Sequence, residues 1–308
     1  MDNKMLFAGS AGLLVVLIVI AVLIIMPFLN AGGLGEKCIG VVEINGEIVA
    51  QGIEPTLFFG GIMGSEDIAK LIEEADEEEG VGAIMLVINT PGGSVVATHE
   101  VHEAVVNAKK PTVAYFREMA ASGGYYIGAG TDYIVSEPSA LTGNIGARIT
   151  YLEMSGLFEK IGLNETSIAE GKFKDIGNPA RKASEEEIGI LQGIVEEEYA
   201  EFKKAVIDGR KGKINENEER IFDSRILTGR QAYSLGLVDK LGGKETAVEE
   251  AGRLAGLKGK PRVCKIEKKE KGWLGGILSE SALFGGFVEA VSEGVMAKIR
   301  GEGFKVNV

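Results

Sequence analysis

The apolar run from Val81 to Ile88 most constrains what this chain can fold into. It has no polar face, so we expect a strand buried on both sides, as in a parallel sheet covered by helices. The run ends in Asn-Thr-Pro-Gly-Gly, and the glycine pair Gly92 and Gly93 predicts a turn before a helix from Val95 to Ala108. The segment therefore indicates an α/β protein.

Strand and helix patterns alternate on both sides of this segment. The expected strands cover 39–44, 112–116 and 133–135, and the expected helices cover 65–79, 120–130, 184–209 and 229–252. This alternation predicts a core with a parallel sheet and right-handed crossovers. The last two helical stretches are expected in the outer layer and in subunit contacts, and loops that carry chemistry are expected at the carboxyl ends of the strands.

Ser122 lies between small residues at the predicted start of a buried helix. A helix N-terminus offers unpaired N–H groups and a positive dipole end, which favour a serine nucleophile and an oxyanion beside it. The same residues also suit an N-cap or close helix packing. The turn at Gly92 and Gly93 could supply oxyanion donors or could be a simple connection, and it lacks the spacing of a phosphate loop.

The base that would activate this serine is not obvious, because the chain contains only two histidines, His99 and His102. They lie three residues apart on a predicted helix, a pattern more typical of a solvated face, so a Ser-His-Asp triad has few candidates. A lysine can replace histidine where burial and the absence of carboxylate partners favour the neutral amine. Lys172 and Lys174, set among glycines and aromatic residues, are the candidates.

Four segments carry a resemblance to signal peptide peptidase A, a family of membrane-bound serine proteases of bacteria and archaea. In chain order they are Asn89–Ser94, Met119–Tyr126, Leu141–Gly146 and Lys174–Ile176. The chain resembles the short form of the family from about Cys38 to about Leu257. The resemblance implies a Ser–Lys dyad on a fold related to the Clp protease and crotonase groups.

The resemblance assigns the nucleophile to Ser122 and the general base to Lys174. It assigns the oxyanion donors to the N–H groups of Gly93 and Gly123. Lys174 would take the serine proton during attack and return it to the leaving amine, and water would release the acyl-enzyme.

One position departs from the family pattern. Asn144 stands where many relatives have a serine, so the role of orienting the lysine would pass to Asn144 or to Thr142. Lys172 also remains a competitor for the base, because it would share a strand face with Lys174 if the segment were extended.

The N-terminal region predicts a single transmembrane helix, since Met5 to Met26 are 22 residues without a charge. At 1.5 Å per residue, this length crosses a hydrocarbon core of about 30 Å. A cleaved signal peptide has a shorter apolar region and a small-residue site, and no Ala-x-Ala follows here. Lys4 and the terminal amine favour a cytoplasmic N-terminus, with the catalytic domain on the outer face.

We therefore expect an anchor at 1–29, a linker at 30–37, a protease domain at 38–257 and an unassigned extension at 258–308. The net charge of −12 and a pI near 4.9 argue against a nucleic-acid partner. No metal or cofactor is expected. Cys38 and Cys264 fit neither a zinc pattern nor a disulfide framework and are assigned no chemistry, although the outer face would permit a bond between them.

The function expected from these observations is a membrane-anchored serine endopeptidase that hydrolyses apolar peptides such as cleaved signal peptides. The family resemblance also implies a ring-shaped homo-oligomer. Three alternatives stay open. A stomatin-associated membrane serine protease uses a similar dyad, a crotonase-like acyl-CoA enzyme would use the glycine N–H groups on a thioester, and a non-catalytic membrane scaffold would use Ser122 only for packing.

Overall fold

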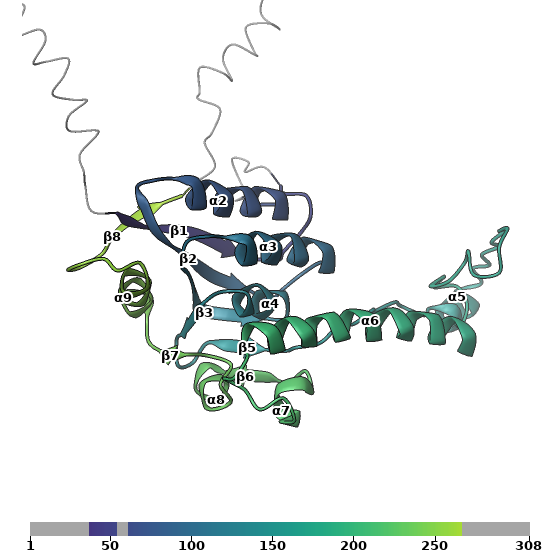
Figure 1. Cartoon of the computed structure of the whole chain (residues 1–308). Coiled ribbons are helices and arrows are strands. Elements are labelled where there is room, and N and C mark those ends of the chain that lie inside the picture. Colours follow the sequence, from purple (N-terminus) through teal and green to yellow (C-terminus); the bar gives the residue numbers. More distant parts are fainter. Residues whose placement is uncertain (1–36, 54–60, 267–308) are drawn as a thin grey trace, which may run out of the picture. The chain divides into compact units, whose positions relative to one another are not determined.

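The computed structural model describes residues 37–53 and 61–266 (Figure 1). The expected transmembrane helix, nearly all of the linker and most of the C-terminal extension lie outside these residues. Within the described ranges, no helix is both long and apolar enough to span a bilayer.

The described strands form one eight-stranded, mostly parallel sheet, which confirms the α/β prediction. Along its main path the order is β6, β5, β3, β2, β1, β8; β4 pairs with β3 and with β7, and the β5–β6 pair is antiparallel. The strands are β1 Cys38–Asn45, β2 Val81–Thr90, β3 Thr112–Ala121, β4 Tyr133–Ser136, β5 Leu141–Gly143, β6 Ile226–Thr228, β7 Lys240–Leu241 and β8 Arg262–Lys265.

Helices cover both faces of the sheet (Figure 1). They are α2 Ser65–Glu77, α3 Val95–Asn107, α4 Gly123–Ala129, α5 Ser155–Ile161, α6 Glu185–Gly209, α7 Glu219–Phe222, α8 Gly229–Ser234 and α9 Lys244–Leu254. In β2, Ile84 and Leu86 pack in the cluster that includes α2, α3 and α4, whereas Met85 and Val87 pack with α9. The run that predicted a doubly buried strand is therefore the centre of the core.

Strand β3 changes its partner along its length. Its first half, Val113 to Phe116, pairs with β4, and its last residues, Met119 to Ala121, pair with β5. β3 stays paired with β5 up to its last residue, Ala121, and the next N–H, that of Ser122, donates to the carbonyl of Gly143 at 2.9 Å. The predicted helix at 120–130 accordingly begins at Gly123, after the longer strand.

The predicted helical stretch at 229–252 was wrong as a single element. It contains two helices, α8 and α9, separated by the short strand β7. Gly236, with φ of +78°, ends the first helix in a conformation that L side chains rarely adopt, and Gly242 and Gly243 precede the second.

Cys38 and Cys264 form a disulfide, which corrects the sequence expectation that they carry no chemistry. Strands β1 and β8 pair in parallel, with Gly40 opposite Cys264, so two residues separated by 226 positions become neighbours. The sheet therefore extends beyond the domain end expected at 257. The bond joins the edge strand β8 to the neighbouring strand β1.

A buried ion pair fastens α6 to the sheet. Arg210, which follows the last residue of α6 and is fully buried, donates to both carboxylate oxygens of Asp239 and to the carbonyl of Gly236. Asp239 in turn accepts the N–H of Ile134 in β4. Burial alone would raise the pKa of Asp239, but the bonds from Arg210 and Lys213 hold it below its ordinary value.

Candidate active site

Ser122 occupies a sharp junction between a strand and a helix. It is the N-cap of α4 and has φ of 52° and ψ of −121°, a conformation that costs a non-glycine residue about 1–3 kcal/mol. A strained strand-to-helix turn is also how nucleophilic serines are presented in other hydrolases. No hydrogen bond from the Ser122 hydroxyl is formed within the described residues, so this oxygen is free to act on a ligand.

Ser122 is one of three non-glycine residues with positive φ in the described part of the chain; the others are Asn144 and Ser224. All three line the same groove, which has a volume of about 700 Å³. Strained backbone collects at functional sites because the surrounding structure must enforce it. This coincidence marks the groove as the candidate active site.

The walls of the groove come from several parts of the fold: the loop after β1, the glycine turn, α3, the β3–α4 junction, the segment after β5, α6, and the segment that leads into β6. The side chains and glycines that line it include Pro91, Gly92, Gly93, Thr98, His99, Met119, Ser122, Gly123, Tyr126, Asn144, Arg148, Glu198, Phe202, Ser224 and Ile226. Apolar and aromatic surface therefore alternates with a few polar groups, as in many ligand sites.

The two predicted oxyanion donors lie beside Ser122. Within the described residues, neither the N–H of Gly93 nor that of Gly123 donates a hydrogen bond. A Cβ on Gly92 would lie 2.7 Å from the nitrogen of Gly123, and a Cβ on Gly93 would lie 2.0 Å from the carbonyl oxygen of Ile48. The close approach of these backbones requires glycine, and it leaves two unpaired N–H groups beside Ser122.

Asn144 and Thr142 have other hydrogen-bond partners. Asn144 Nδ2 donates to the carbonyl of Ser224 at 2.8 Å, and Thr142 Oγ1 donates to the carbonyl of Ala120 at 2.7 Å. Asn144 lines the groove, whereas Thr142 is buried beside it in β5. No hydrogen bond joins either side chain to Lys174 within this chain, so the proposed orienting role is untested.

Lys174 lies elsewhere in the fold, in a segment of turns between α5 and α6. Its side chain is exposed and is not part of the groove. The next residue, Asp175, accepts a hydrogen bond from Arg181 at 3.0 Å, and Arg181 donates to both carboxylate oxygens of Glu187 in the first turn of α6. The lysine is thus attached to the N-terminal end of α6.

The groove and the lysine segment contact different parts of α6. Glu187 holds the lysine segment, whereas Glu198, eleven residues later, lines the groove. At a rise of 1.5 Å per residue, these points are about 16 Å apart along the helix axis. Within one chain, the structure therefore does not bring Lys174 to Ser122.

Lys172 does not share a strand face with Lys174, because the segment forms turns rather than an extended strand. Its ammonium pairs with Glu186 and lies 4.9 Å from the centroid of the Phe173 ring. Both ends of this contact are exposed.

Comparison with known proteins decides the family. The model of peptidase family S49 matches residues 104–258, and that of Clp protease matches residues 63–138. A protease of Methanocaldococcus jannaschii is 36% identical over 209 residues, covering 67% of each chain. The chain belongs to peptidase family S49.

Other relatives of this S49 chain have more specific names. The protein named signal peptide peptidase SppA of Enterococcus faecium is 35% identical over 220 residues, covering 70% of this chain and 63% of the relative. The chloroplastic serine protease SPPA of Arabidopsis thaliana is 28% identical over 236 residues, covering 76% of this chain and 35% of the relative. The resemblance read from the sequence and the serine-protease class are therefore confirmed.

A solved structure supports the fold of the S49 chain. The membrane-bound stomatin-specific protease 1510-N, as a serine-to-alanine mutant, matches 77% of this chain and 100% of its own with a TM-score of 0.50. Its sequence identity of 17% shows a shared fold only. The stomatin-associated alternative is thus not favoured over the family with relatives at 35% identity.

The histidines of this S49 chain do not form a solvated face, which corrects the sequence expectation. His99 lines the groove with its ring centroid 5.0 Å from that of Tyr126, and His102 packs edge-on to Tyr126 at 4.7 Å. Burial, followed by the charge of His99, lowers the pKa of His102 to about 4. No hydrogen bond joins either ring to Ser122.

Sequence reasoning missed the α3–α6 wall of the groove. Tyr126 follows Ser122 by one helical turn, and Glu198 and Phe202 are one turn apart on α6; this spacing was the available signal. Ser224 was not a predicted site residue either, yet it lines the groove and its hydroxyl donates to the carbonyl of Ile145 at 2.7 Å.

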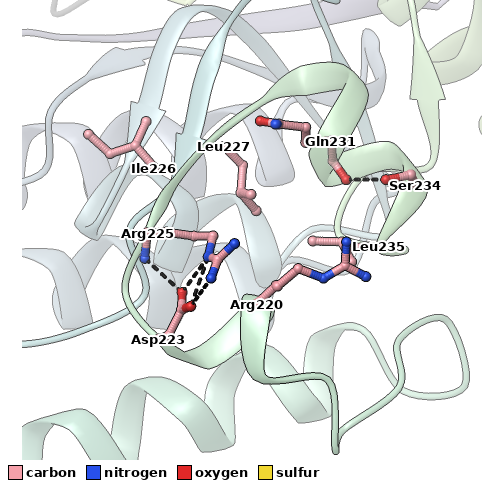
Figure 2. Close-up of a pocket in the computed structure, with 8 residues that line it drawn as sticks. All are labelled: Arg220, Asp223, Arg225, Ile226, Leu227, Gln231, Ser234 and Leu235. Atoms are coloured by element: carbon pink, nitrogen blue, oxygen red, sulfur yellow. Dashed lines mark hydrogen bonds and ion pairs between the residues drawn. The ribbon is translucent and has the colours of Figure 1, made fainter.

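A smaller pocket of about 440 Å³ shares Ile226 with the groove, and Figure 2 shows the residues that line it. Arg220 and Arg225 line it, but Arg220 pairs with Glu218 and Arg225 pairs with Asp223. Each guanidinium already has a carboxylate partner, so this pocket offers less for chemistry than the groove at Ser122.

Proposed function

We propose that this S49 chain is a membrane-anchored serine endopeptidase that cleaves apolar peptides, such as signal peptides released from their proteins, with Ser122 and Lys174. One observation carries the proposal: Ser122 is held in a strained junction, inside a groove, beside two N–H groups without partners. The peptide substrate class comes from the relatives named signal peptide peptidases.

The mechanism follows from these positions. A peptide bound in the groove places its carbonyl carbon at Ser122 Oγ and its oxygen toward the N–H groups of Gly93 and Gly123. The neutral amine of Lys174 takes the serine proton and passes it to the leaving nitrogen, and water then cleaves the acyl-enzyme by the same route. Each oxyanion donor contributes about 10²–10³ in rate.

The base in this proposal comes from a neighbouring subunit. Supporting this, the exposed segment that carries Lys174 is held at Glu187, which lies about 16 Å along α6 from Glu198 in the groove. The surface around this segment is unusually apolar for a monomer. Its exposed apolar side chains are Ile149, Leu152, Leu157, Ile161, Leu163, Ile168, Ile188, Ile190 and Ile194. A closed ring of identical subunits would bury this surface and complete each site with a lysine in trans.

Placement of the domain on the outer face of the membrane has separate support. The uncharged segment from Met5 to Met26 is long enough for an anchor. The disulfide between Cys38 and Cys264 suits an oxidising compartment. Protease protection of right-side-out and inverted vesicles tests this topology, because only right-side-out vesicles should leave the domain accessible.

Complementation tests the site and its sharing together. The full chain in detergent should cleave apolar peptides, and Ser122→Ala and Lys174→Ala should each be inactive. Co-expression of the two variants should restore part of the activity, since mixed rings contain intact pairs of Ser122 and Lys174. Activity in Ser122→Ala alone would refute the nucleophile, and an inactive mixed oligomer would place both groups in one chain.

A further inference from the structure

Two buried polar atoms in the described part of the chain have no hydrogen-bond partner, and both belong to residues of the groove. They are Thr98 Oγ1 on α3 and Glu198 Oε2 on α6. An unpaired buried polar atom costs about 1–3 kcal/mol. Such atoms are rare in folded proteins, and a ligand that supplies the missing partner accounts for them.

Aromatic rings lie beside the unpaired carboxylate oxygen. Phe202 follows Glu198 by one turn of α6, and its ring centroid is 4.9 Å from that of Tyr126. Burial, then the charges of Glu201 and Glu198, raise the pKa of Tyr126, as expected if the negative charge of Glu198 is close to that ring. This wall therefore combines a carboxylate with two aromatic rings.

No cation of the described chain neutralises Glu198. None of the ion pairs within residues 37–53 and 61–266 includes it, although Arg148 lines the same groove. His102, in the same aromatic cluster, is neutral near pH 7 because its pKa is about 4. Within the described residues, this wall of the groove therefore contains a carboxylate without a paired cation.

We propose that the wall formed by Thr98, Tyr126, Glu198 and Phe202 is a subsite for a lysine or arginine side chain of the peptide substrate. An ionised carboxylate only accepts hydrogen bonds, so its partner must be a donor, and a cation adds charge attraction to the hydrogen bond. The aromatic rings would pack on the methylene stem and attract the cation. Thr98 Oγ1 would accept a second N–H.

This inference rests on the proposed function, because the side chain belongs to a peptide bound for cleavage at Ser122. It changes the expected substrate from a wholly apolar peptide to an apolar peptide with one basic residue at a fixed distance from the cleaved bond. The net charge of −12 would also attract such peptides from solution.

Peptide pairs that differ at one position test the subsite. Each pair carries lysine or norleucine, which has a similar stem without the ammonium, and the position is moved along an apolar sequence. The full chain in detergent should prefer lysine at one position by about 10- to 100-fold in kcat/KM. The absence of any position that favours lysine would overturn the subsite.

Substitution of the carboxylate identifies the partner. Glu198→Gln keeps the size of the side chain and should bring the lysine-to-norleucine ratio to about one, and Glu198→Lys should favour a glutamate peptide. Glu197→Gln is the matched control, since Glu197 is exposed on α6 and does not line the groove. An unchanged ratio in Glu198→Gln, or an equal fall for both peptides, would contradict the proposal.

Binding separates this inference from the proposed function. Ser122→Ala should bind the fluorescent lysine peptide about tenfold more tightly than the norleucine peptide in fluorescence anisotropy. If Ser122→Ala still cleaves peptides, the proposed nucleophile is wrong whatever the selectivity. If light scattering shows that Glu198→Gln alters the oligomer while the ratio stays unchanged, Glu198 contacts a subunit and the subsite is refuted.

Discussion

Asn144 and Ser224 hold each other in strained conformations on one wall of the groove. The amide of Asn144 donates to the carbonyl of Ser224 at 2.8 Å, and the two residues have φ of 53° and 62°. The hydroxyl of Ser224 in turn donates to the carbonyl of Ile145, the residue after Asn144. This reciprocal contact joins the segment after β5 to the segment before β6.

Replacing Asn144 should separate backbone strain from the lost hydrogen bond. Asn144→Gly tolerates the positive φ but loses the hydrogen bond of the side-chain amide. Asn144→Ala loses the same hydrogen bond and also tolerates the positive φ poorly. We expect Asn144→Ala to be less stable than Asn144→Gly by about 1 kcal/mol. Urea unfolding measures this difference, and equal stabilities would show that the left-handed backbone at Asn144 carries no strain.

Lys174→Ala should abolish peptide hydrolysis with the fold intact, because no other group in the proposal removes the serine proton. Lys172→Ala should lower activity by no more than a few fold, since its contact with Glu186 is exposed. Measurements of kcat on both variants, with circular dichroism as the control for folding, check the assignment. Full activity in Lys174→Ala would refute the proposed dyad of Ser122 and Lys174.

The buried His102 should make the domain acid-sensitive. Its pKa is about 4 in the fold, because of burial first and the charge of His99 second, against about 6.5 when unfolded. Between these values the unfolded chain binds a proton that the folded chain excludes, so stability falls as the pH drops from 6.5 toward 4. His102→Gln should reduce this pH dependence in urea titrations at pH 5 and pH 8.

The same side chains test the nature of the base. If lysine is the base, the pH at which kcat/KM rises should be unchanged when His99 and His102 are both replaced by Gln. The magnitude of kcat/KM is free to change, because His99 lines the groove. If the rise of kcat/KM with pH is shifted or lost in the double variant, the base is a histidine.

The strands and the position of Ser122 between a strand and a helix could be predicted from the sequence because their signals are local. The run from Val81 to Ile88 has one interpretation in an α/β fold, and Ser122 follows a strand and precedes a helix in the residue order itself. The unpaired oxygens of Thr98 and Glu198 could not be predicted in this way. Their residues are 100 positions apart and meet only after α3 and α6 have packed around Tyr126.

Two other features depended on distant contacts. The disulfide requires β1 and β8 to be neighbours, which no local pattern reveals when the two cysteines are 226 positions apart. The position of Lys174 depends on the path of the chain through α5 and along α6. The family resemblance proposed Lys174 as the base. It could not show that Lys174 lies outside the groove of its own chain.

Removing one partner of the buried ion pair between Arg210 and Asp239 should be strongly destabilising at neutral pH. Arg210→Met leaves the buried carboxylate without its main partner, and we expect a loss of about 3–5 kcal/mol. The pKa of Asp239 is lowered in the fold, so its contribution is present at neutral pH and is lost as pH falls below the ordinary range of aspartate. Thermal unfolding at pH 7 and pH 3 should therefore show a larger difference between wild type and variant at pH 7.

The disulfide between Cys38 and Cys264 closes a covalent ring that contains both Ser122 and Lys174. A single peptide-bond cut anywhere between the two cysteines opens this ring without releasing a fragment. If one subunit nicks another, the pieces stay together until a reductant is added. A nicked domain would then differ from an intact one by the mass of one water molecule, and reduction would separate it into two fragments on a gel.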